Sequence, residues 1–271
     1  MQSTLRHTVA LAALLAVASP VALAAQNGAR ETDNTFDWSA KIPAGSWLRV
    51  RNLNGPVDVE SSSSDVAEVH AVKHARGDSD PKRVHFVVTN DGSNVTICAL
   101  WNEGDTCDAD GYHSHHDGDD DHQHIEVAFT VKLPKGVKMN AGTVNGDVTV
   151  RGAEAPVAAH TVNGAVEAAT TTGPLDASTV NGDVRVSIDA LSGDGDLSYS
   201  TVNGSIVARL PAHLDAEVDM QTVNGSLASD YPLTLTGRIN PRRHLHAVIG
   251  NGGRQIRLHT VNGSIELKKP S

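Results

Sequence analysis

Six copies of one tetrapeptide organise the second half of the chain. The first copy reads Thr143-Val144-Asn145-Gly146, and the same four residues begin again at Thr161, Thr179, Thr201, Thr222 and Thr260. Each copy is followed by one small or acidic residue and then by an aliphatic one. Successive asparagines are 18, 18, 22, 21 and 38 residues apart. A recurring period of this length indicates a stacked repeat architecture.

The Asn-Gly pair has a competing interpretation, because it is also the strongest short signal for a β-hairpin. In a two-residue hairpin Val144 would face Asp147 and Thr143 would face Val148. Apolar residues would then be split between the two faces of the sheet in every copy. The pattern instead favours a solenoid corner, with Gly146 supplying the permissive backbone at the bend. We expect Val144 and Val148 to point inward and Thr143 to point outward or sit on the corner.

Stacked corners place identical side chains in columns about 4.8 Å apart. Amide side chains in one column can hydrogen-bond along the axis, as in stacked Asn ladders. The expected structural ladder consists of Asn145, Asn163, Asn181, Asn203, Asn224 and Asn262. The last step of 38 residues equals two periods of 19, and we expect a degenerate coil around residues 250–258 to fill it. A weaker copy of the corner lies upstream, at residues 52–57.

The N-terminal part of the chain is strand-like but irregular. We assign residues 25–133 to this N-terminal β region and residues 134–271 to the repeats. Seven of the nine aromatic residues lie between Phe36 and Phe129, and we expect them to plug one end of the solenoid. The predicted fold class is therefore all-β: a single-stranded parallel β-helix, expected to be right-handed, with an irregular N-terminal β region capping one end.

Residues 1–24 carry the pattern of a secretory signal peptide. Arg6 precedes an apolar run from Val9 to Ala18, and Ala22-Leu23-Ala24 fits the small-x-small rule for cleavage. We therefore expect an exported protein, located in the periplasm or at the cell surface. The net charge of −10 argues against nucleic acid as a partner. No apolar run after the leader reaches membrane-spanning length.

The two cysteines, Cys98 and Cys107, are close in sequence. In an exported chain, an even and closely spaced pair favours a disulfide. A metal-thiolate pair is the alternative, because histidines follow closely.

An insertion at about residues 105–124 is rich in histidine and aspartate. Neutral imidazoles and carboxylates are suitable ligands for Zn²⁺, Cu²⁺ or Ni²⁺. The alternative is a solvated segment of low complexity. We expect no dedicated cofactor, and at most an adventitious divalent metal. The candidate ligands are His113, His115, His116, His122 and His124.

No catalytic constellation stands out in the sequence. The repeat acids Asp147 and Asp183 are replaced by Ala165 or by serine in the other copies, which indicates a solvated face. The scattered histidines, including His160 and His259, are interpreted as surface polar positions.

One segment leads into the repeats, Leu133-Pro134-Lys135-Gly136-Val137, and Ile249-Gly250-Asn251-Gly252-Gly253 precedes the last copy. Together with the Thr-Val-Asn-Gly corners, this arrangement resembles the bacterial "putative adhesin" domain of unknown function over roughly residues 35–268. The resemblance implies an exported β-solenoid and no established reaction. We therefore expect a non-enzymatic envelope or cell-surface protein that offers a stacked β face to an envelope protein or a surface polymer. A carbohydrate-active β-helix enzyme and a metal-binding periplasmic protein are the alternatives.

Overall fold

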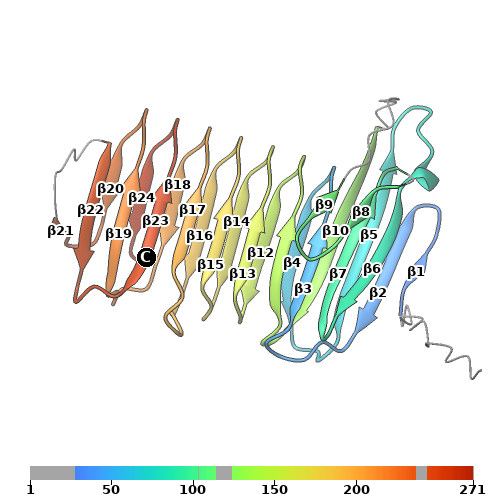
Figure 1. Ribbon diagram of the computed structural model, residues 1–271, viewed down its shortest axis with the longest axis horizontal. Coiled ribbons are helices and arrows are strands. Elements are labelled where there is room, and N and C mark those ends of the chain that lie inside the picture. The colour runs from blue at the N-terminus through green and yellow to red at the C-terminus, as the bar shows by residue number, and fades with distance from the viewer. Residues whose placement is uncertain (1–27, 103, 114–123, 236–242, 271) are drawn as a thin grey trace, which may run out of the picture.

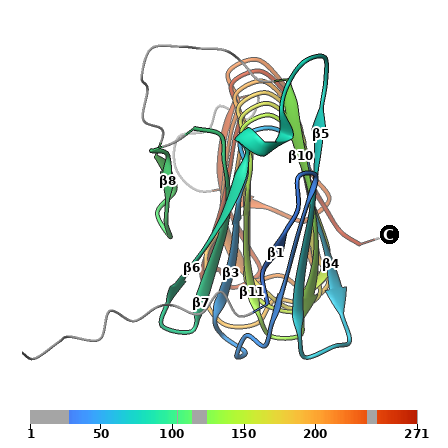
Figure 2. The same ribbon diagram turned by 90° about the vertical axis from the view of Figure 1, so that its right-hand side faces the viewer.

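The computed structural model describes residues 28–102, 104–113, 124–235 and 243–270 (Figure 1). Within these ranges the chain is built of strands, with one short 3-10 turn, η1 (Pro81–Arg83). The strands form two eleven-stranded sheets, here called sheet A and sheet B, and one two-stranded hairpin. The two large sheets lie face to face along the length of the molecule (Figure 2). None of these residues belongs to a helix long and apolar enough to cross a membrane.

Each coil of the solenoid contributes one strand to each sheet, joined by an Asn-Gly corner. Four successive coils carry the repeats that follow the N-terminal region. Their sheet B and sheet A strands are β11 (Lys138–Gly142) with β12 (Val148–Ala153), β13 (Val157–His160) with β14 (Val166–Thr170), β15 (Leu175–Ser178) with β16 (Val184–Ile188), and β17 (Leu197–Ser200) with β18 (Ile206–Arg209). Neighbouring coils pair in parallel, with Val148 opposite Val166 and Val166 opposite Val184. The predicted parallel β-solenoid is therefore confirmed.

The N-terminal region continues both sheets rather than forming sheets of its own. Strands β3 (Trp47–Arg51) and β4 (Val57–Ser62) make a first coil around Asn54, and they pair in parallel with β11 and β12. Further strands then close this end on both sides; in each sheet the first of them pairs in parallel with this coil, and those beyond it are antiparallel. Sheet A is extended by β1 (Arg30–Glu31), β2 (Thr35–Ala40), β5 (Ala67–Ala75) and β10 (Ile125–Pro134), and sheet B by β6 (His85–Asp91) and β7 (Asn94–Leu100).

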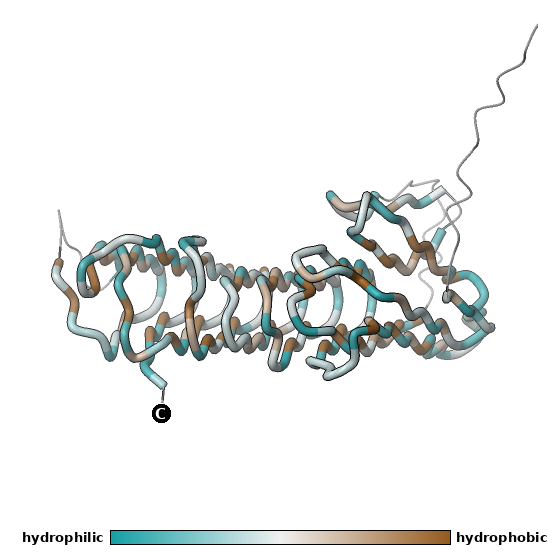
Figure 3. The backbone as a smooth tube through the Cα atoms, turned by 90° about the horizontal axis from the view of Figure 1, so that it is seen from below, coloured by the Kyte–Doolittle hydropathy of each residue, from teal (hydrophilic) through white to brown (hydrophobic). Residues whose placement is uncertain are grey.

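Aromatic side chains fill the capped end, as expected from their distribution in the sequence. The rings of Phe36 and Phe86 stack with centroids 4.4 Å apart, and Phe129 meets Phe86 edge-on at 5.8 Å. Trp38 is buried beside them in the same hydrophobic cluster. Further along the axis the buried residues are mostly aliphatic, with Tyr199 and Tyr231 as the aromatic ones. The tube view shows apolar and polar residues alternating along both sheets (Figure 3).

The expected orientation is confirmed for Val148, which is buried, but it is wrong for the threonine and the valine within the Thr-Val-Asn-Gly copies. The repeat threonines are buried, whereas Val162, Val180, Val202 and Val223 are 37–43% exposed. The strand before each corner sets the orientation of the threonine, because side chains alternate between the two faces of a strand. Val157 and Ala159 point inward, so Thr161, two residues further on, also points inward. The buried hydroxyl is satisfied, since Thr161 Oγ1 donates to the carbonyl of Gly146 in the preceding coil over 2.8 Å. The same bond recurs in the other five copies.

Side-chain amides join the corners along the axis. Asn163 Nδ2 donates to Asn145 Oδ1 over 2.9 Å, and Asn181 Nδ2 donates to Asn163 Oδ1 over 2.8 Å. Equivalent bonds continue through Asn203, Asn262 and Asn224. We call this column the asparagine ladder.

The glycine of each corner is needed because adjacent coils approach very closely there. A Cβ on Gly182 would lie 2.0 Å from the carbonyl oxygen of Gly164.

The expected degenerate coil around residues 250–258 does not exist. Strand β19 (Ala216–Gln221) and strand β20 (Leu227–Ser229) form the last coil of the stack, and the chain then turns back through β21 (Thr234–Leu235) and β22 (His244–Ile249). Strand β22 pairs antiparallel with β19 and covers its outer edge. Strand β23 (Arg254–His259) then inserts between β17 and β19, and β24 (Ile265–Lys268) inserts between β18 and β20. The order along the axis is therefore Asn203, Asn262, Asn224.

Candidate binding face on sheet B

The outer faces of the two sheets differ in the side chains that cover them. Sheet A carries long charged residues tied into ion pairs, such as Lys132 with Glu60 at 2.5 Å and Lys268 with Glu266 at 2.6 Å. Sheet B carries mostly short side chains across the middle of the solenoid. The outward residues of β13, β15 and β17 are Ala158, His160, Asp176, Ser178, Ser198 and Ser200. We call the outer side of β3, β11, β13, β15 and β17 the sheet B face.

A disulfide-tied hairpin stands beside this face at its N-terminal end. The hairpin consists of β8 (Thr106–Cys107) and β9 (Tyr112–His113), and Figure 2 shows it outside sheet B. Cys107 is bonded to Cys98 of β7 with a Cα–Cα distance of 6.3 Å, which confirms the disulfide prediction over the metal-thiolate alternative. Tyr112 donates its hydroxyl to Asp105, and burial raises the pKa of this tyrosine. The hairpin is therefore held by a covalent bond and by a buried polar pair.

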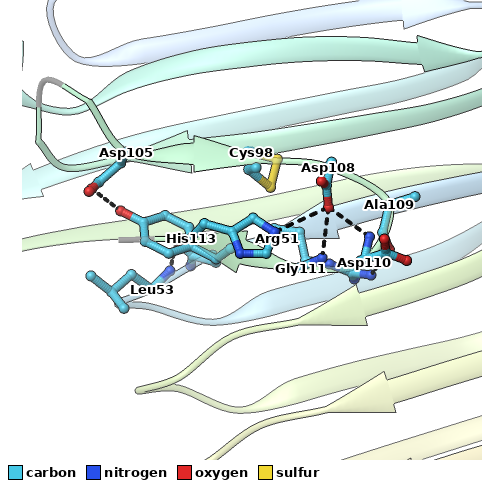
Figure 4. The surroundings of a disulfide bond; sticks show 12 residues. Arg51, Leu53, Cys98, Asp105, Asp108, Ala109, Asp110, Gly111 and His113 are labelled. Carbon is cyan, nitrogen blue, oxygen red and sulfur yellow. Dashed lines mark hydrogen bonds and ion pairs between the residues drawn. A yellow bond between two sulfur atoms is a disulfide. The ribbon is translucent and has the colours of Figure 1, made fainter. Parts of the chain in front are cut away.

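Arg51 links the hairpin to the solenoid. Its Nη1 donates to Asn140 Oδ1 over 2.8 Å, and its Nη2 donates to the carbonyl of Ala109 at the hairpin tip over 3.2 Å (Figure 4). The guanidinium lies over Gly142, where an added Cβ would come within 3.6 Å of Nη1. Burial, and then repulsion from Arg49, lower the pKa of Arg51, while Asp108 acts in the opposite direction.

Arg49 lies beside Arg51 on β3, and one of its nitrogens has no partner. Its Nη1 is buried and finds no hydrogen-bond acceptor in the described part of the chain. The guanidinium carbon lies 5.8 Å from the centroid of Trp47, and Lys138 Nζ lies 5.6 Å from the same ring. Two of the cations at this end of the face are therefore positioned by one aromatic side chain.

A histidine, a serine and an aspartate meet on the next two coils. His160 Nδ1 lies 2.8 Å from Ser178 Oγ across adjacent strands, and Asp176 is on the same face of β15. Burial lowers the pKa of His160, with Asp176 opposing and Arg51 adding to this effect. Burial raises the pKa of Asp176. His160 is therefore neutral near pH 7. Its Nδ1 donates to Ser178 Oγ in one tautomer and accepts from it in the other.

This group is not a hydrolytic triad in its present geometry. A triad needs a second hydrogen bond, from the base to the carboxylate that orients it. His160 makes no such bond to Asp176 within the described residues.

Two of the five candidate metal ligands fall in the described ranges. His113 Nε2 lies 3.5 Å from Asp108 Oδ1, whereas His124 pairs through its backbone, with its carbonyl accepting from Arg76 N and its N–H donating to Ser79. His115, His116 and His122 lie outside the described residues, as does the predicted signal peptide. Among the residues the structure describes, no three His, Cys, Asp or Glu side chains come together as a metal site.

A profile of the Toastrack DUF4097 family matches residues 39–268. The chain belongs to the Toastrack DUF4097 family. The match confirms the resemblance inferred from the corners and from the segment Leu133–Val137.

Several solved structures are similar to this Toastrack chain. One is a "putative cell adhesion protein" from Clostridium sporogenes, with 8% identity and a TM-score of 0.47, covering 86% of this chain and 99% of that one. Another is a "putative adhesin" from Bacteroides fragilis, with 11% identity and a TM-score of 0.38, covering 88% of this chain and 98% of that one. No curated protein matches the sequence.

The polar cluster of this Toastrack protein was missed by sequence reasoning. His160 was interpreted as an isolated surface residue. Its position, directly before the repeat threonine, is filled in neighbouring coils by Gly142 and Ser178. Comparing that one position across the copies would have placed His160 beside Ser178. Arg49 and Arg51 lie on β3, just before the weak copy of the corner, and only the parallel pairing of β3 with β11 places them beside the repeats.

Proposed function

We propose that this Toastrack protein is a non-enzymatic, exported envelope or cell-surface protein that binds a surface polymer or an envelope protein along its sheet B face. The observation that carries the proposal is the contrast between the two outer faces. Charged side chains on sheet A satisfy one another, as in the ion pair between Lys132 and Glu60. Short side chains on β13, β15 and β17 leave this face flat, with serine hydroxyls open to close approach by an extended partner.

The proposed location rests on two features. Residues 1–24 have the pattern of a secretory leader. The bond between Cys98 and Cys107 suits an oxidising compartment such as the periplasm or the cell exterior.

Binding is favoured over catalysis because the polar groups on the face lack a catalytic arrangement. The hydrogen bond between His160 and Ser178 is the feature that speaks for the enzymatic alternative. A screen of uronate polymers and peptidoglycan for released product tests it, with Ser178→Ala as the matched variant. Product release by the intact protein that is lost in Ser178→Ala would overturn the non-enzymatic assignment.

A pair of substitutions on one coil tests the binding face. Ser198 on β17 and Val207 on β18 face outward on opposite sides of the same coil. The purified protein carrying Ser198→Trp is expected to recover less envelope material than wild type, whereas Val207→Trp is expected to recover the same amount. Equal recovery by all three proteins, with unchanged thermal midpoints, would exclude the sheet B face.

A further inference from the structure

The N-terminal end of the sheet B face carries three cations. Arg49 and Arg51 are outward residues of β3, and Lys138 is the outward residue opposite Trp47 on β11. No ion pair joins these three side chains to a carboxylate in the described part of the chain. In a protein with a net charge of −10, this is an unusual concentration of unpaired positive charge.

The hydrogen bonds of the two arginines leave donors unused. Arg51 donates to neutral acceptors only, namely the side-chain and backbone oxygens of Asn140 and the carbonyl of Ala109. Arg49 Nη1 is buried with no acceptor in the described residues. A buried donor without an acceptor costs free energy, so native structures normally supply one. An oxyanion placed at this point would satisfy the open donor of Arg49.

The two guanidinium groups are held near each other against their mutual repulsion. The repulsion from Arg49 contributes to the lowered pKa of Arg51. The contacts described above hold both side chains in place: Trp47 lies under Arg49, and Asn140 with the hairpin tip fixes Arg51. Asp108 offsets part of the charge, but its Oδ1 accepts from the backbone N–H groups of Asp110 and Gly111 and makes no hydrogen bond to Arg51.

We propose that Arg49 and Arg51, flanked by Lys138, form a binding site for an oxyanion, a carboxylate or a phosphate, carried by an acidic surface polysaccharide. The proposal rests on the proposed function, because the site lies at one end of the sheet B face and would anchor a polymer laid along it. A planar guanidinium presents two parallel donors that match either oxyanion. The acidity of the rest of the protein repels polyanions, so binding depends on this local cluster.

Calorimetric titration of the full chain with three defined polysaccharides tests the site. Oligogalacturonate carries carboxylates, phosphomannan carries phosphates, and mannan is the neutral control. Arg49→Gln removes the open donor, and Arg49→Lys keeps the charge without the fork. Arg151→Gln is the matched control, because Arg151 lies on the outer face of sheet A, 3.9 Å from Asp58, and its loss changes the net charge equally.

Wild type is expected to bind at least one anionic probe at least about tenfold more tightly than mannan. Arg49→Gln is expected to weaken that binding by about tenfold or more, Arg49→Lys by less, and Arg151→Gln by less than about twofold. The thermal midpoint of Arg49→Gln is expected to equal or exceed that of wild type, because an unsatisfied buried donor is removed. Binding of oligogalacturonate alone identifies a carboxylate site, and binding of phosphomannan alone identifies a phosphate site.

Two outcomes would overturn the oxyanion site. The first is equal weakening by Arg49→Gln and Arg151→Gln, which would mean that binding follows overall charge. The second is a wild-type protein that binds neither anionic probe. The proposed function is judged separately, since the comparison of Ser198→Trp with Val207→Trp does not depend on charge. If Ser198→Trp loses envelope recovery and wild type binds neither anionic probe, the sheet B face is supported and the oxyanion site is refuted.

Discussion

Replacing Gly182 by alanine should separate two coils of the solenoid. The new Cβ would lie 2.0 Å from the carbonyl oxygen of Gly164, whereas ordinary van der Waals contact begins near 3.4 Å. Two backbones must therefore move apart by about 1.4 Å at a point where stacked strands are spaced by about 4.8 Å. Neither backbone can move freely, because each is bonded to a further coil.

The cost follows from the bonds that cross this step. Gly164 N donates to the carbonyl of Asn181 over 3.0 Å, Thr179 Oγ1 donates to the carbonyl of Gly164 over 2.8 Å, and the ladder bond from Asn181 to Asn163 is 2.8 Å long. Three such bonds at about 0.5–1.5 kcal/mol each give a loss of about 2–4 kcal/mol. For a chain of this size the thermal midpoint should fall by about 5–15 °C.

Far-UV circular dichroism during heating measures the effect, with Gly195→Ala as the matched control. A Cβ at Gly195 would make only ordinary contact, 3.4 Å from the ring of Pro174. This control should stay within about 0.5 kcal/mol of wild type. If Gly182→Ala melts with Gly195→Ala, the close packing of the corners does not contribute to stability and the reasoning fails.

Four other changes are expected to have measurable effects. Asn163→Ala should lower the free energy of unfolding by about 1–2 kcal/mol, because Asn163 both donates and accepts in the ladder. Asn224→Ala, at the end of the ladder, should lower it by about half as much. Equal thermal midpoints for both variants and wild type would refute the ladder. Tyr199→Phe should raise the thermal midpoint and increase the free energy of unfolding by about 1 kcal/mol, since the buried hydroxyl has no partner in the described residues. A lower thermal midpoint would mean that the hydroxyl has a hydrogen-bond partner. Burial holds the pKa of His160 below its usual value near 6.5, so the unfolded chain takes up the proton first as pH falls. The free energy of unfolding should therefore decline as pH drops below about 6.5. His160→Gln should reduce this dependence on pH, and an unchanged dependence would contradict the assignment. If the histidine-rich insertion holds a metal site, calorimetry should detect Zn²⁺ binding that weakens as pH falls through about 6.5. The binding should disappear when residues 114–123 are deleted. Absence of Zn²⁺ binding at neutral pH would refute the metal site.

The solenoid was predictable because its repeats are nearly identical. The Asn-Gly corners occur at a regular period, and the in-register pairing of Val148, Val166 and Val184 follows from that period alone. The inward position of Thr161 could also have been obtained from the alternation of Val157 and Ala159. Hydropathy alone favours an inward valine, whereas the buried threonine hydroxyl has an acceptor in the preceding coil.

The polar end of the sheet B face was not predictable in the same way. Arg51, Asn140 and the hairpin carbonyl of Ala109 are far apart in the chain and belong to no Thr-Val-Asn-Gly copy. Their meeting depends on the disulfide that folds the hairpin back over β7 and on the pairing of β3 with β11. The reversed order of the last two coils depends on the antiparallel return of β22, for which the sequence offers only a long gap between two asparagines.

The insertion of the final coil has a consequence for how the protein is made. Residues Arg254–Lys268 follow both neighbouring coils in the chain, yet they occupy a slot between them (Figure 1). Until β23 is in place, the edge of β17 and the inner edge of β19 lack a neighbour, so these coils cannot assemble one after another in chain order. Truncation of the chain before Arg254 would therefore open a gap inside the stack rather than shorten it. For the same reason, a domain fused directly after Lys268 would leave the solenoid between two coils, instead of extending it from its tip.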